Sequence, residues 1–131
     1  MSTILAIDPG REKCGLAVVS QAGVLHHEVV AREMLVETAA ALTELHSVDR
    51  IIVGAGTAGR QVLRAIVERI SAIPVELVDE TLSSRRARNR FFEENPPRGL
   101  RRLIPRGLLT PSRPYDDYAA IILGEDHLNR A

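Results

Sequence analysis

The sequence predicts an α/β domain whose mixed five-stranded sheet, three antiparallel strands followed by parallel ones, has helices on both faces. Three observations predict it. Short β-rich runs separated by glycine-containing turns come first. Apolar runs then alternate with segments of helical period, and strands linked through helices normally run parallel. The chain has 131 residues, 45% of them hydrophobic, which fits one domain spanning residues 1–131.

Five short segments have the character of strands. The first ends in Asp8-Pro9-Gly10, a tight-turn sequence that places a carboxylate at the end of a buried run. The second and third flank Gln21-Ala22-Gly23, a loop short enough for a hairpin. The expected strands are residues 3–7, 15–20, 24–31, 50–54 and 74–79.

Four segments have the character of helices. Leu35, Ala39, Leu42 and Leu45 recur at steps of three and four, which predicts an amphipathic helix over 34–46. A second helix is expected from about residue 58, and a third, very basic one ends before residue 95. Five prolines exclude long regular structure over 95–114, and the acidic pair at 116–117 suits the start of a last helix that runs toward residue 129.

The charges are balanced overall but unevenly distributed. Lysine and arginine number 17, as do aspartate and glutamate, so the net charge is zero. Between residues 85 and 113, however, nine arginines face two glutamates, and this basic arm suits phosphate. The alternative is a solvated charged face. With one cysteine, Cys14, and no apolar run of about 20 residues, we expect a cytoplasmic protein without a disulfide or a membrane partner.

Three acidic sites end or begin the predicted elements: Asp8, the pair Asp79-Glu80, and the pair Asp116-Asp117. Parallel, neighbouring first and fourth strands would bring their loops to one edge of the sheet. Carboxylates gathered there would hold Mg²⁺ or Mn²⁺, which can support phosphodiester hydrolysis. The alternative is an ordinary turn residue at Asp8 and first-turn acids in the last helix.

Within each acidic pair, one member is preferred. Asp116 shares a helical face with residues 119, 120 and 123, which should pack inward, so we rank it as the ligand and Asp117 as its neighbour. Strand alternation lets only one of Asp79 and Glu80 reach the site. By the same alternation, His26 and His27 face opposite sides, which argues against a shared metal ion.

Three motifs in order resemble the YqgF family, and the similarity spans nearly the whole chain. They are the run 6–10 with Lys13, Gly15 and Ala17, the run 78–84 with Ala87-Arg88, and Asp116-x-x-Ala119-Ala120 followed by Ile-Ile-Leu. The resemblance implies a ribonuclease H-like nuclease. It also implies that Asp8, Glu80 and Asp116 are catalytic metal ligands and that Lys13 contacts phosphate or orients the attacked group near that site.

The resemblance implies a function in 5′-end maturation of pre-16S ribosomal RNA by metal-dependent cleavage. The alternatives are a resolvase of four-way DNA junctions, which a homodimer rather than a monomer would favour, and a non-catalytic nucleic-acid-binding module. The residues expected to bind substrate are Lys13, Arg85, Arg86, Arg98, Arg101 and Arg102.

Overall fold

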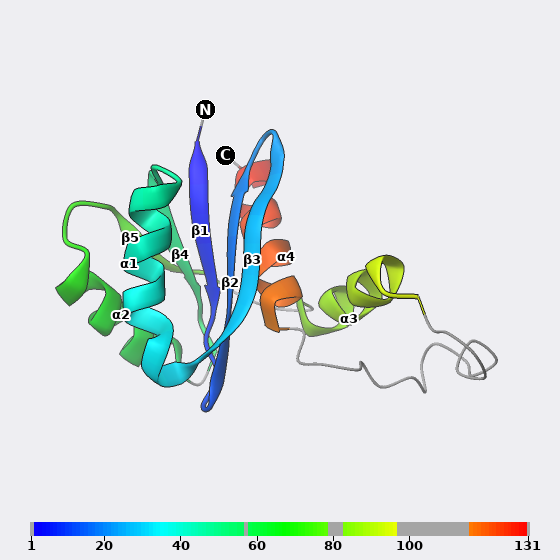
Figure 1. The fold of residues 1–131 in the computed structure, drawn as a ribbon, viewed down its shortest axis with the longest axis horizontal. Helices are drawn as coiled ribbons and strands as arrows, with labels where there is room; N and C mark the ends of the chain where they lie inside the picture. Colours follow the sequence, from blue (N-terminus) through cyan, green and yellow to red (C-terminus); the bar gives the residue numbers. More distant parts are fainter. Residues whose placement is uncertain (1, 57, 79–82, 97–115, 131) are drawn as a thin grey trace.

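The computed structural model describes residues 2–56, 58–78, 83–96 and 116–130, and it contains a five-stranded mixed sheet (Figure 1). The strands lie in the order β3-β2-β1-β4-β5. Both β1–β2 and β2–β3 pair antiparallel, whereas β1–β4 and β4–β5 pair parallel, as predicted. The strands are β1 (Thr3–Asp8), β2 (Lys13–Ser20), β3 (Gly23–Ala31), β4 (Arg50–Gly54) and β5 (Val75–Val78).

Helices cover both faces of this sheet, which confirms the predicted architecture. In Figure 1, α1 (Leu35–Leu45) and α2 (Gly59–Arg69) lie on one side, and α3 (Ser83–Glu94) and α4 (Asp116–Arg130) lie on the other. A short 3₁₀ turn, η1 (Arg32–Met34), leads into α1. None of the helices in these described ranges is both long and apolar enough to cross a membrane.

Strand alternation divides the core into two clusters, one on each face. Leu5 and Ile7 of β1 pack with α1 and α2, whereas Ile4 and Ala6 pack with α3 and α4. Phe91 and Phe92 belong to the α3/α4 cluster and are only 1% and 3% exposed, so both phenylalanine side chains lie in the core. Cys14 is fully buried in the α1/α2 cluster.

The predicted core face of α1 is wrong at its last position. Leu45 ends the helix and is 76% exposed, although its spacing from Leu42 continues the apolar stripe. The chain turns there through Ser47, which has a φ of 52°, and the N–H of Val48 donates to the carbonyl of Thr43 at 3.1 Å. Val48 is thereby buried in the α1/α2 cluster and occupies the core position beyond Leu42.

Candidate functional site

Asp8 is the last residue of β1, and its side chain belongs on the sheet face that α4 covers. Ile4 and Ala6, two and four residues earlier, pack in the α3/α4 cluster, and alternation carries Asp8 to the same face. Asp8 is partly buried and pairs across the sheet with Gly15. Because β1, β4 and β5 are parallel, Asp8 lies at the edge where Gly54 and Val78 also end their strands.

The turn that follows Asp8 is fixed by three contacts to its backbone. The guanidinium of Arg32 donates to the carbonyl of Gly10 at 2.9 Å, and the N–H of Arg32 donates to the carbonyl of Glu12 at 2.8 Å. The N–H of Gly10 points to Sγ of Cys14 at 3.5 Å. A Cβ on Gly10 would lie 2.2 Å from the carbonyl oxygen of Lys13, so this tight turn requires glycine.

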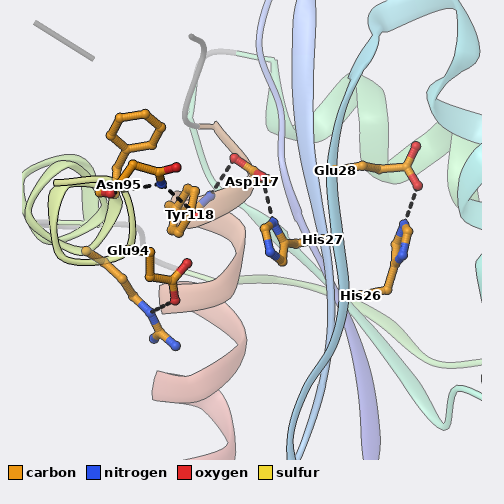
Figure 2. A network of polar contacts seen from close by, with 9 residues as sticks. His26, His27, Glu28, Glu94, Asn95, Asp117 and Tyr118 are labelled. Atoms are coloured by element: carbon orange, nitrogen blue, oxygen red, sulfur yellow. Dashed lines mark hydrogen bonds and ion pairs between the residues drawn. The ribbon is translucent and has the colours of Figure 1, made fainter. Parts of the chain in front are cut away.

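The start of α4 lies against β3 through a hydrogen bond between Asp117 and His27 (Figure 2). The side chain of Asp117 is only 3% exposed, and its Oδ2 lies 2.7 Å from Nδ1 of His27. Its Oδ1 accepts the N–H of Tyr118 at 3.1 Å, and the rings of His27 and Tyr118 lie 5.3 Å apart. A carboxylate buried this deeply needs such partners to offset its desolvation.

His26 and His27 face opposite sides of β3, as predicted. Figure 2 shows His26 bonded to Glu28 on the side away from α4. Sequence reasoning used this alternation only to argue against a shared metal ion, and it missed the pairing of His27 with Asp117. Ninety positions separate the two residues, so no local spacing could have indicated the contact.

A surface pocket of about 430 Å³ opens beside this pair. It is lined by residues 28–31 of β3, together with Lys13, His27 and Asp117. Lys13 begins β2 and pairs with Ala31. The pocket therefore lies at the end of the sheet where Asp8 is found.

Two arginines of the basic arm pair with acids of α4. Arg86 makes two parallel hydrogen bonds to Asp126, at 2.6 and 3.0 Å, and these raise the pKa of its guanidinium above the ordinary value. Arg90 pairs with Glu125 and, at 3.8 Å, with Glu94 of its own helix. The pairs with Asp126 and Glu125 join α3 to α4, and substrate binding by Arg86 stays a prediction.

Several predicted site residues fall outside the described part of the chain. Glu80, Arg98, Arg101 and Arg102 lie in the ranges 79–82 and 97–115, and the side chains of Arg85 and Asp116 are also outside it. Among the side chains that are described, no three His, Cys, Asp or Glu form a metal-binding group. Only Asp8 of the three predicted ligands belongs to that set, so their convergence stays a prediction.

Comparisons with known proteins agree with this fold. A family model described as RuvX, Holliday junction resolvase, matches residues 2–129. The structure is similar to RuvC of Thermus thermophilus in complex with a Holliday junction substrate, at 17% identity and a TM-score of 0.61, over 99% of this chain and 96% of that one.

A second Thermus thermophilus RuvC structure is 18% identical with a TM-score of 0.59, over 98% of this chain and 95% of that one. No curated protein matches significantly. At these identities the structural likeness shows the fold, which is that of ribonuclease H-like proteins. Since the family model matches almost every residue, the chain belongs to the RuvX Holliday junction resolvase family, the YqgF family that its three motifs resemble.

Proposed function

We propose that this protein is a divalent-metal-dependent endonuclease that hydrolyses phosphodiester bonds in structured nucleic acid. The observation that carries the proposal is the position of Asp8, at the carboxyl end of a central strand and on the sheet face against which α4 packs. Asp116 is the first residue of α4. Membership of a resolvase family supports the same activity.

Asp8, Glu80 and Asp116 would hold Mg²⁺ or Mn²⁺. Their oxygen ligands suit a hard cation, and Glu80 follows two positions after Val78, which packs against the α3/α4 cluster. When bound, the cation would polarise the phosphate and activate the attacking water. Arg32 and Cys14 hold the backbone of the turn that follows Asp8, through contacts to Gly10 and Glu12. This fixed turn would keep Asp8 in place.

Lys13 and the arginines at 85, 86, 98, 101 and 102 would bind the sugar-phosphate backbone. Contacts of this kind position nucleic acid without reading its sequence, so selectivity would come from the shape of the substrate. The family match favours a four-way DNA junction as that substrate. The motif resemblance to the YqgF family favours the 5′ leader of pre-16S ribosomal RNA as a second candidate.

A cleavage assay tests the activity and chooses between these substrates. The purified chain is incubated with a labelled four-way junction, its duplex arms and a labelled pre-16S leader, with Mg²⁺ or Mn²⁺ and with a chelator. We expect metal-dependent cutting that Asp8→Asn, Glu80→Gln and Asp116→Asn each abolish. The control Glu44→Gln removes an exposed acid of α1, on the opposite face of the sheet, and should cut normally.

The result that contradicts the nuclease is binding of the junction or the leader without cutting under any metal condition. The chain would then be a nucleic-acid-binding module. Cutting that persists fully in Asp8→Asn would also contradict the proposed ligand set.

A further inference from the structure

His27 is held in one orientation by a buried carboxylate. Its Nδ1 lies 2.7 Å from Asp117, whose side chain is 3% exposed, whereas the His27 side chain is 33% exposed. The ring of Tyr118 packs beside it at 5.3 Å. A carboxylate bonded to one ring nitrogen fixes the orientation of an imidazole and leaves the other nitrogen for a ligand. No described residue makes a hydrogen bond to Nε2 of His27.

The pocket beside His27 contains a lysine and an imidazole that could bind an anion. The two carboxylates in its lining, Asp117 and Glu28, already accept hydrogen bonds from other groups of the protein. Asp117 is bonded to His27 and to the N–H of Tyr118, and Glu28 is bonded to His26. Lys13 lines the same pocket, is exposed, and makes no ion pair with any side chain in the described ranges. The start of the 15-residue helix α4, which is the positive end of its dipole, lies at the same place. This combination suits an anion.

The pocket is close enough to Asp8 for one nucleic-acid strand to reach both. Asp8 pairs with Gly15, and Gly15 pairs with Val29, which lines the pocket. Two strand spacings separate Asp8 from Val29, roughly 10 Å. That is about three nucleotide rises of 3.4 Å along one strand of B-DNA.

We propose that this pocket binds a backbone phosphate of the substrate a few nucleotides from the cleaved bond, with Nζ of Lys13 and Nε2 of the imidazolium form of His27 as the donors. Asp117 is the positioning residue that aims His27. The inference rests on the proposed nucleic-acid substrate but not on cleavage, so binding without metal can test it.

Two substitutions of His27 separate phosphate binding from a purely structural contact. Asparagine places an amide nitrogen as many bonds from Cα as Nδ1, so His27→Asn keeps the contact to Asp117 and loses Nε2. Glutamine places its nitrogen at the Nε2 level instead. We expect His27→Asn to bind a labelled four-way DNA junction about tenfold more weakly in chelator, the effect of one charge-assisted hydrogen bond. His27→Gln should bind with an affinity between those of His27→Asn and the unmodified protein.

A substitution of Lys13 tests the pocket independently, and a substitution of His26 is the matched control. Lys13→Gln should weaken binding and lower the slope of log affinity against log salt by about one. His26→Asn changes the adjacent residue on the opposite face of β3 and should bind normally. A labelled RNA hairpin, measured in parallel, shows whether the pocket accepts both kinds of backbone, and thermal melting checks that each variant is folded.

Unchanged affinity in His27→Asn and Lys13→Gln would overturn the inference and leave the nuclease proposal intact. Weaker binding by His27→Gln than by His27→Asn would assign His27 a structural role only, and would also overturn it. If the chain binds the junction in a manner dependent on His27 but never cuts it, the phosphate pocket stands and the nuclease proposal falls.

Discussion

Gly124 of α4 lies directly against Val19 of β2. A Cβ built on this glycine would come within 2.5 Å of Cγ2 of Val19 and 3.4 Å of Cβ of Ala6. Val19 is fully buried and β-branched, so it has little freedom to move aside. The absence of a side chain at position 124 therefore lets α4 approach the sheet closely. Asp116 is the first residue of this helix, so the same contact helps to place Asp116.

Gly124→Ala should destabilise the protein by about 1–3 kcal/mol, the usual range for an overpacked core. In a Val19→Ala background the same change should become neutral or stabilising, because alanine is favoured over glycine in a helix by about 1 kcal/mol. Urea unfolding of the four proteins in this double-mutant cycle measures both effects. Equal effects in the two backgrounds would show that the Gly124–Val19 contact does not limit the packing.

Most of the fold could be predicted from sequence because its signals are local. The tight turn after Asp8, the loop 21–23 and the helical period of α1 each fix an element within a few residues. The parallel pairing of β1 with β4 followed from the helical connection between the hairpin and β4. Leu45 was placed wrongly because periodicity does not reveal where a helix leaves the core.

The contacts around the candidate site could be predicted only in part. Asp8 was identified because a turn sequence follows it directly. The roles of His27 and Arg32 were missed, because their partners Asp117 and Gly10 are 90 and 22 positions away and are brought near only by packing of the sheet. Periodicity specifies which face a residue occupies, whereas it does not specify which residue of another element will meet it there.

Ser47→Gly should stabilise the protein by about 0.5–1 kcal/mol. Ser47 has a φ of 52° in the turn that ends α1, and this left-handed conformation costs an L-residue more than the extra entropy that glycine loses on folding. Thermal or urea unfolding measures the change. The control Ser71→Gly alters an exposed serine outside the left-handed region and should be neutral or slightly destabilising. A loss of stability in Ser47→Gly as large as in the control would contradict the assignment.

Asp126→Asn should increase affinity for nucleic acid if Arg86 binds substrate. The change weakens the two hydrogen bonds that hold the guanidinium of Arg86 and removes a negative charge beside it. Arg86→Met should lower affinity, and combining the two changes should cancel the gain from Asp126→Asn. Junction binding measured at several salt concentrations checks this. A gain from Asp126→Asn that survives in the double variant would come from the charge alone.

The Arg86–Asp126 pair should contribute little to the free energy of unfolding, and this contribution should not depend on pH near neutrality. It is half-exposed, so Arg86→Met should cost less than about 1 kcal/mol, and less still at high salt. The pKa of Arg86 is higher in the folded protein than in the unfolded chain. The pair therefore stabilises the protein fully at any pH below the pKa of an unfolded arginine, and this stabilisation is lost only as pH rises through the pKa of the folded state. Unfolding at neutral pH and at about pH 10 should therefore give the same cost for Arg86→Met.

Arg32→Met should slow metal-dependent cleavage about tenfold while leaving junction binding in chelator unchanged. Arg32 holds the turn after Asp8 through the carbonyl of Gly10, and groups that support a metal ligand typically change metal affinity or activity by 10- to 100-fold. The backbone contact from Arg32 to Glu12 is retained in the variant, so the turn should persist in a looser form. Higher metal concentration should restore part of the lost rate.

Arg60→Met, which removes an exposed arginine from α2, is the matched control and should cut normally. If Arg32→Met instead loses junction affinity in chelator and cuts at the normal rate once saturated with substrate, Arg32 is a substrate contact and does not position Asp8.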